Sequence, residues 1–294
     1  MERTPPYNQK LNILLLCCPF CHEDIVKEGT VMRCKNSAHG SFLVDNDGRP
    51  HLISAATAAQ FVEEHQSGIN RLKSFLKRYP RLYYAVWYVV CPVLLSGSRP
   101  QSVRRWLKDK AIVVDLGSGP RRSHSDFITV DVFSFDEVDI VAEANNLPFK
   151  DGSLDAVVNE SLLEHVQDPR AVVREIVRVL KPSGMLYASV PFLTPYHASP
   201  DDFNRWTKSG LRKLFSEFEP VEEGVDAGPW SAFLVFLAYW LGVVFSFGSK
   251  SLATKLAFVF MIILGPLKIF DFLFSRLPGA DTVAAQLYFI GRKK

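Results

Sequence analysis

Cysteine is scarce in this chain, with only five among 294 residues, too few for a disulfide scaffold of this size. The 17 glycines follow no repeat, which excludes a collagen-like chain, and the 48% hydrophobic content excludes intrinsic disorder. No secretory signal is visible, because the apolar run at residues 11–20 leads into a Cys-x-x-Cys pair without a cleavage site. We therefore expect a cytoplasmic protein with reduced thiols and a large core.

Acidic residues are nearly missing from residues 71–110, which contain ten Lys or Arg and one acid, Asp109. This segment carries a charge of +9, so the rest of the chain carries −6 within the total of +3. Tyrosine, tryptophan and aliphatic residues alternate with the bases, a composition typical of a membrane interface. The segment predicts an anionic partner, and a packed helix with a solvated basic edge is the alternative.

Charge is missing altogether from residues 227–249, and nine of the 22 phenylalanines lie between Phe233 and Phe274. This first apolar run is close to the ~20 residues that a spanning helix needs. Lys250 and Lys255 would lie on the far side of a spanning hairpin, against the positive-inside tendency. The pattern therefore favours an in-plane or re-entrant pair of helices and a peripheral or monotopic membrane protein. Two buried helices of a soluble domain are the alternative.

Four residues near the N-terminus have the spacing of a metal site, C-x2-C-x12-C-x4-H, namely Cys18, Cys21, Cys34 and His39. Three thiolates and one imidazole suit tetrahedral zinc, and Cys17 is a substitute for Cys18. Residues 41–53 have the pattern of a strand, an Asp-Gly turn and a second strand. With its CPxC knuckle and DGRPHLI run, the segment resembles small zinc-ribbon proteins related to methyltransferase activators. A ribbon that has lost its metal is the alternative.

The centre of the chain alternates short apolar runs with helical patterns, which predicts a parallel α/β sheet. Asp168 and Pro169 have the residue types of a helix cap and first turn, and Thr207 opens another helix reaching residue 218. The expected strands cover residues 111–116, 127–132, 139–144, 154–159 and 185–190.

Residues 111–192 resemble the class I S-adenosylmethionine-dependent methyltransferases of the type-11 group. The matching runs are VVDLGSG, NLPFKDGSLDAVV, ESLLEHVQDP and REIVRVLKPSGMLYASVPF, in the family's order. The resemblance implies a methyl-transferring enzyme with a Rossmann-like, seven-stranded α/β sheet and S-adenosylmethionine as cofactor. EPVEEGV and VAAQLYFIGRKK resemble its last two strands. The expected organisation is a ribbon at 1–55, a linker at 56–110, the methyltransferase domain at 111–226 and 280–294, and an apolar helical hairpin inserted at 227–279.

The resemblance also implies which residues hold the cofactor. Asp115 orders the glycine loop and reaches the methionine end, Asp131 takes the ribose hydroxyls, and Glu143 falls near the adenine position. Asn159 lies beside the methyl-bearing sulfur, and the loop itself supplies Gly117, Ser118 and Gly119. Only eleven residues separate Gly119 from Asp131, so the helix that usually follows the loop is expected to be short or missing. Weak cofactor binding and a non-catalytic scaffold therefore stay open.

The segment after the fifth strand shapes the acceptor pocket in this family and offers Tyr196, His197, Asp201, Arg205 and Trp206. His165 and His197 are candidates for a general base, if the acceptor carries a proton that must be removed. The apolar insertion must leave and return on one side of the domain, which favours a lipid or lipid-linked acceptor at a membrane surface. An RNA or protein acceptor, gripped by the ribbon and the basic segment, is the alternative.

Overall fold

The computed structural model describes residues 12–54, 57, 86, 88–197 and 201–294. Most of the basic segment predicted at 71–110 therefore lies outside the described residues, which include it only at residue 86 and from residue 88 onward.

The described residues form one eleven-stranded sheet with the order β1-β2-β3-β4-β7-β6-β5-β8-β9-β11-β10. Within it, β7-β6-β5-β8-β9 are parallel, and β11 runs antiparallel between β9 and β10. The predicted Rossmann-like, seven-stranded methyltransferase sheet is confirmed in this part. The strands are β1 (Ile25–Glu28), β2 (Val31–Cys34), β3 (Ser41–Val44), β4 (Pro50–Leu52), β5 (Val113–Leu116), β6 (Ile128–Asp131), β7 (Ile140–Ala142), β8 (Leu154–Glu160), β9 (Leu180–Pro191), β10 (Phe218–Ala227) and β11 (Gln286–Lys293).

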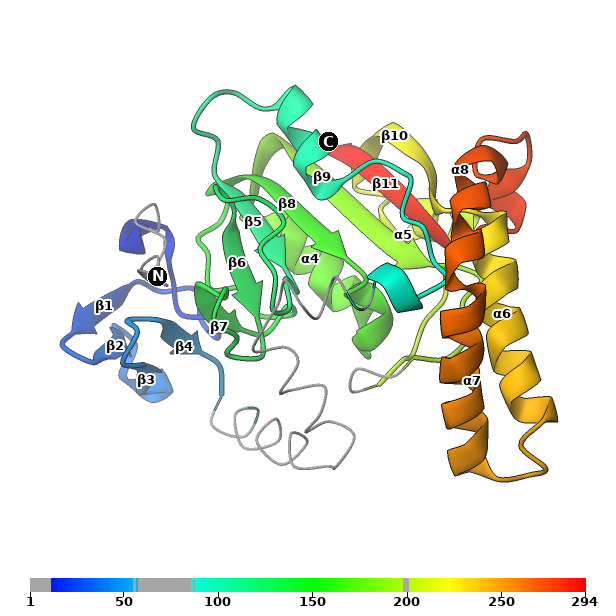
Figure 1. The fold of residues 1–294 in the computed structure, drawn as a ribbon. Helices are drawn as coiled ribbons and strands as arrows, with labels where there is room; N and C mark the ends of the chain where they lie inside the picture. The colour runs from blue at the N-terminus through cyan, green and yellow to red at the C-terminus, as the bar shows by residue number, and fades with distance from the viewer. Residues whose placement is uncertain (1–11, 55–56, 58–85, 87, 198–200) are drawn as a thin grey trace.

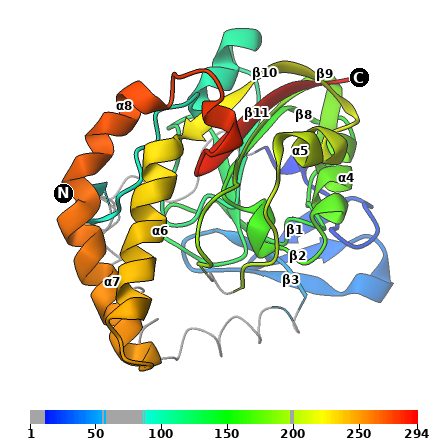
Figure 2. The same cartoon turned by 90° about the vertical axis from the view of Figure 1, so that its right-hand side faces the viewer.

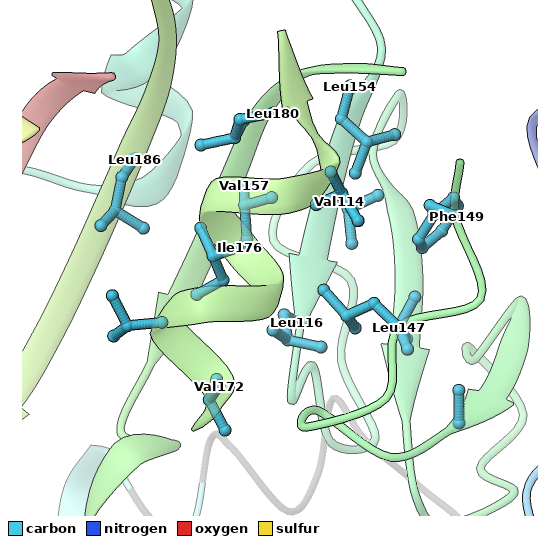
Figure 3. Packing of buried hydrophobic residues seen from close by; sticks show 14 of the residues in the cluster. Val114, Leu116, Leu147, Phe149, Leu154, Val157, Val172, Ile176, Leu180 and Leu186 are labelled. Carbon is cyan, nitrogen blue, oxygen red and sulfur yellow. The ribbon is translucent and has the colours of Figure 1, made fainter. Parts of the chain in front are cut away.

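The two faces of the sheet are covered differently. Helices α4 (Pro169–Val179) and α5 (Lys208–Leu214) pack on one face, where Val172 and Ile176 of α4 meet Val114 and Val157 of the strands (Figure 3). The other face is covered by the 3-10 helix η3 (Pro100–Trp106), through Val103. The described residues between β5 and β6 contain no helix, as the short spacing predicted.

The N-terminal strands are continuous with the main sheet. β4 pairs in parallel with β7, with His51 opposite Val141. A second attachment lies beside η1 (Ile13–Leu15), where the amide of Cys17 donates to the carbonyl of Pro148 at 3.1 Å. Leu16 and Leu52 are buried in the same core as the main domain. The N-terminal unit, residues 12–54, is therefore built onto the edge of the sheet.

The apolar insertion is a pair of antiparallel helices at the opposite side of the molecule, α6 (Pro229–Val244) and α7 (Lys250–Leu264) (Figures 1 and 2). The chain returns through η5 (Gly265–Phe270), α8 (Asp271–Phe274) and η6 (Ala280–Thr282) to β11. The helices cross closely at Gly242, where an added Cβ would lie 2.7 Å from the carbonyl oxygen of Ala253. The insertion is thus a compact hairpin between β10 and β11.

One carboxylate fixes the base of this hairpin. Asp271 of α8 is fully buried and accepts hydrogen bonds from the amides of Gly228, Trp230 and Ser231 at 2.8, 3.1 and 3.2 Å. These amides lie at the start of α6, where helix N–H groups have no partner within the helix. Asp271 therefore joins the end of the hairpin to its beginning.

Candidate active site

The glycine loop, Gly117–Gly119, follows β5. This strand lies in the middle of the parallel strands, with β6 and β7 on one side of it and β8 and β9 on the other. Crevices of this kind at the carboxyl ends of parallel strands bind ligands in open α/β sheets. The amide of Gly117 donates to the carbonyl of Val130 at 2.8 Å, so the loop folds over the end of β6. Gly117 has a φ of +72°, and an added Cβ would lie 2.8 Å from the side chain of Leu162. Glycine is required here for both reasons.

The two predicted acids at this edge are both buried and both hold the loop backbone. Asp115 accepts from the amide of Ser123 at 3.0 Å, and burial raises the pKa of Asp115 to about 6. Asp131, at the end of β6, accepts from the amide of Gly119 at 2.8 Å and from that of Phe133 at 2.9 Å. Each carboxylate oxygen has a second lone pair, so Asp131 can hold the loop and still accept ribose hydroxyls.

Arg122 holds the loop that stands where the helix is missing. Its guanidinium donates to both oxygens of the fully buried Asp139, at 2.7 and 2.9 Å, and to the carbonyl of Phe127 at 2.6 Å. A bidentate pair of this kind fixes both position and orientation. This role of Arg122 was not predicted from the sequence, although a basic residue in a shortened glycine loop was a visible signal.

Asn159 and Glu160 end β8 beside the glycine loop. Asn159 is fully buried, and neither polar atom of its amide has a hydrogen-bond partner in the described part of the chain. Such unpaired amides are costly, so this position fits a polar ligand group. Burial, together with the charge of Asp226, raises the pKa of Glu160 to about 7, and Arg121 donates to Glu160 at 3.2 Å. Glu160 was not among the residues predicted from the sequence to lie in the site.

Glu143, predicted near the adenine, lies just after β7 and is half-buried. Its carboxylate accepts one hydrogen bond from the hydroxyl of Thr57 and another, at 3.3 Å, from the side-chain amide of Asn146. It therefore links the sheet edge to the chain that follows the N-terminal unit.

The predicted acceptor segment divides into exposed and buried parts. Tyr196 is 66% exposed, whereas Trp206 is 8% exposed and packs in the main core. Arg205 forms a bidentate pair with Asp202. Tyr196 is thus available to an acceptor, and Trp206 anchors the segment.

The two candidate bases lie together, although 32 positions separate them in the sequence. His165 is the last residue of η4 (Leu163–His165), and its ring centroid lies 5.3 Å from that of His197. Both rings approach the carboxylate of Glu164, at 3.8 and 3.7 Å from their Nε2 atoms. The interaction with Glu164 is the main cause that raises the pKa of His197. No role was predicted for Glu164 from the sequence, although it directly precedes His165.

The four predicted metal ligands also lie together, in the N-terminal unit. One ligand atom from each of Cys18, Cys21, Cys34 and His39 lies within 4.8 Å of the others. The sulfurs of Cys21 and Cys34 are 3.5 Å apart. Cys17 pairs instead with Asp24 in an antiparallel bridge and lies outside this group.

Residues 102–188 match a family model described as a methyltransferase domain. This part of the chain is a class I methyltransferase domain. The domain is similar over 53 residues, with 47% identity, to a probable S-adenosylmethionine-dependent methyltransferase of Mycobacterium tuberculosis, covering 17% of this chain and 19% of that protein.

Two further relatives of the domain have more specific names. Similarity to a ubiquinone biosynthesis O-methyltransferase of Xanthomonas oryzae pv. oryzae extends over 44 residues at 50% identity, covering 15% of this chain and 18% of that protein. Similarity to a demethylmenaquinone methyltransferase of Clavibacter sepedonicus extends over 102 residues at 34% identity, covering 32% and 42%. The chain thus covers less than half of the length of each of these three relatives.

Proposed function

We propose that this chain transfers the methyl group of S-adenosylmethionine to a lipid or lipid-linked acceptor at a membrane surface. A lipid acceptor is supported mainly by one observation. The exposed apolar hairpin lies at the edge of the sheet that also bears the glycine loop. The transfer chemistry itself is supported by the methyltransferase domain and the buried, ligand-ready groups of that edge.

Residues of three strand ends would hold the cofactor. Asp115 lies in β5, the Gly117–Gly119 loop follows that strand, Asp131 ends β6, and Asn159 lies in β8. When bound, S-adenosylmethionine supplies an electrophilic methyl group on a sulfonium. The protein's contribution is alignment, because a displacement at this carbon needs an acceptor atom held in line.

The hairpin exposes large apolar side chains over most of its length. Nine of them are 45–64% exposed, namely Phe233, Phe236, Trp240, Val243 and Val244 on α6, and Phe258, Val259, Ile262 and Ile263 on α7. Ala257 is the one buried residue of α7. An apolar surface of this extent marks a protein or membrane interface rather than a solvated face.

The lengths of the helices favour a hairpin that lies in one leaflet. At 1.5 Å per residue, the 16 residues of α6 extend about 24 Å, short of the ~30 Å hydrocarbon core. One apolar stretch, Lys250–Phe274, is 25 residues long and contains an 18-residue window with mean hydropathy 2.1; it includes α7, η5 and α8. Asp271 within this stretch is bound at the base of α6, so the stretch cannot leave the domain as a straight span.

The base of the hairpin adjoins the acceptor segment. The amides of Phe192 and Leu193 donate to the carbonyls of Ala285 and Ala284, at 2.9 and 3.1 Å. A hollow of about 270 Å³ lies beside these residues, lined mainly by apolar groups that include Trp230, Phe274, Leu277, Pro278 and Val283. An acceptor with an apolar tail could lie along the hairpin and present its polar end to residues 191–197 and 201–206. The names of two relatives, which refer to ubiquinone and demethylmenaquinone, agree with an acceptor of this kind.

Vesicle flotation tests the membrane part of the proposal. The variant Phe236→Ser/Trp240→Ser/Val243→Ser removes three half-exposed side chains, each contributing about 1 kcal/mol to partition, so binding should fall about 100-fold. A control, Leu14→Ser/Leu43→Ser, removes two exposed apolar side chains from the N-terminal unit and should bind as the parent does. Equal binding of all three proteins to phosphatidylglycerol–phosphatidylcholine vesicles would exclude the hairpin as the membrane contact.

Methyl-labelled cofactor tests the acceptor. Purified protein is incubated with a whole-cell extract, and the label is followed after partition into organic solvent. We expect label in the organic phase, lost in Asp131→Ala, which lacks the carboxylate that holds the loop. Label in RNA or protein would contradict a lipid acceptor and direct attention to the N-terminal unit and the basic segment. The absence of transfer, with cofactor still bound, would identify a scaffold.

We also propose that Cys18, Cys21, Cys34 and His39 hold a structural zinc ion. The donor set suits tetrahedral zinc, and the Nδ1 atom of His39 is buried without a hydrogen-bond partner in the described residues. The ion would join the turn before β1 to the end of β2, since Cys18 and Cys21 lie before β1 and Cys34 ends β2. The site would thereby stabilise the unit whose β4 extends the methyltransferase sheet.

A further inference from the structure

A second group of possible metal ligands lies at the acceptor edge, where Glu164, His165 and His197 meet. Glu164 is fully buried, and neither oxygen of its carboxylate accepts a hydrogen bond from the described residues. Burying an ionised carboxylate without a partner costs several kcal/mol. A nearby cation is therefore needed to balance Glu164.

The orientation of His165 shows which of its nitrogens carries the proton. Its Nδ1 lies 2.6 Å from the backbone carbonyl oxygen of Asp201, which can only accept a hydrogen bond. Nδ1 therefore donates, and in the neutral ring Nε2 presents a lone pair. That lone pair lies 3.8 Å from Oε1 of Glu164.

His197 is placed similarly. Its Nδ1 lies 3.2 Å from the carbonyl oxygen of Pro195, 3.4 Å from Oδ2 of Asp202 and 3.3 Å from Nη2 of Arg205. The two oxygens can only accept and the guanidinium can only donate, so these contacts admit both tautomers of the neutral ring. A metal ion on Nε2 selects the tautomer in which Nδ1 donates to the oxygens, and Asp202 is itself held by Arg205. Nε2 of His197 lies 3.7 Å from Oε1 of Glu164.

The Nε2 atoms of two imidazoles and a carboxylate thus converge at separations too long for hydrogen bonds. A metal ion with ligand distances of about 2.1 Å and tetrahedral angles places its ligand atoms about 3.4 Å apart. The observed 3.7 and 3.8 Å differ from this by a few tenths of an ångström. The outer partners, a carbonyl and a carboxylate on the Nδ1 atoms, are those that orient histidine ligands at metal sites.

We propose that Glu164, His165 and His197 bind a divalent transition-metal ion. Two imidazoles and one carboxylate suit Zn²⁺, Co²⁺, Mn²⁺ or Fe²⁺ and leave coordination positions open. The side chain of His197 is 41% exposed, so a further ligand can approach the ion from solvent beside residues 191–197 and 201–206. An oxygen of an acceptor could occupy one of them. The site itself does not depend on the proposed membrane function.

Metal content of the purified full-length chain tests the site. After removal of metal by a chelator and reloading with Co²⁺, His197→Ala should hold one equivalent less than the parent, whatever the four-ligand site of the N-terminal unit holds. The control His124→Ala changes a histidine that accepts from the amide of Asp126, away from the cluster, and should keep the parent's content. Cys21→Ser/Cys34→Ser should retain the Co²⁺ absorption of a nitrogen and oxygen site and lose thiolate charge-transfer bands.

Thermal unfolding provides a readout that does not depend on transfer activity. In the Cys21→Ser/Cys34→Ser background, Co²⁺ should raise the Tm, and Glu164→Gln, which keeps the side-chain volume, should abolish that rise. Asp202→Asn should weaken Co²⁺ binding about tenfold, as expected for a partner outside the ligand set. Equal metal content in His197→Ala and the parent, or no effect of Co²⁺ on the Tm in this background, would overturn the proposal. A proton would then be the cation that balances Glu164.

Discussion

The loop after the glycine motif should depend on Arg122 for its stability. Arg122→Met removes both guanidinium bonds to the fully buried Asp139 and leaves that carboxylate without its cation. Breaking a buried ion pair costs about 3–5 kcal/mol. Asp139 keeps two bonds from Thr129, at 2.9 and 3.1 Å, so we expect the lower end, about 3 kcal/mol. This corresponds to a Tm lower by about 6–12 °C.

The neighbouring arginine is the matched control. Arg121 has a side chain 49% exposed and contacts Glu160 at 3.2 Å, so Arg121→Met should cost no more than about 1 kcal/mol. Urea unfolding followed by fluorescence measures both variants. Adding Asp139→Asn to Arg122→Met should recover part of the loss, because a neutral amide needs no countercharge. Stabilities of Arg122→Met and Arg121→Met within 1 kcal/mol of each other would refute the role of the clamp.

Three further predictions concern other parts of the fold. Because the pKa of Glu160 is raised to about 7 in the folded state, its ionisation destabilises the fold as pH rises from 4.5 to 7. The stability of Glu160→Gln relative to the parent should therefore increase between pH 5 and pH 8, by on the order of 3 kcal/mol. The prediction is contradicted if the urea midpoints of variant and parent differ by the same amount at pH 5 and at pH 8. Asp271→Ala leaves three amides at the start of α6 without their acceptor. The variant should lose about 3 kcal/mol of unfolding free energy and exchange these amide hydrogens faster. The control Asp281→Ala, at the surface, should lose less than about 1 kcal/mol. Cys34→Ser should lose the zinc equivalent that Cys91→Ser retains, as measured by metal analysis; zinc retained in both would argue against the ribbon site.

Much of the methyltransferase sheet could be predicted from the sequence because its signals are local. The strands β5 and β8 are short apolar runs that end in polar or glycine residues, and α4 begins with Asp168 and Pro169. Asp168 accepts from two amides of the first turn, which is why the cap could be recognised from residue type alone. The boundaries were less exact, since the helix expected to reach residue 218 ends at Leu214, where β10 needs Phe218 for its pairing with β11.

Contacts between distant segments could not be derived in the same way. Arg122 finds Asp139 only once β6 and β7 lie side by side, and Glu164 meets His197 only because η4 and the segment after β9 end at one edge. The pairing of β4 with β7 could not be predicted from the sequence either, because it depends on which edge strand of the folded sheet is available for pairing. The sequence thus determined the local elements, the glycine loop and the apolar character of the hairpin. The tertiary structure decided which charged groups are buried together, because that depends on the packing of strands and loops remote in the chain.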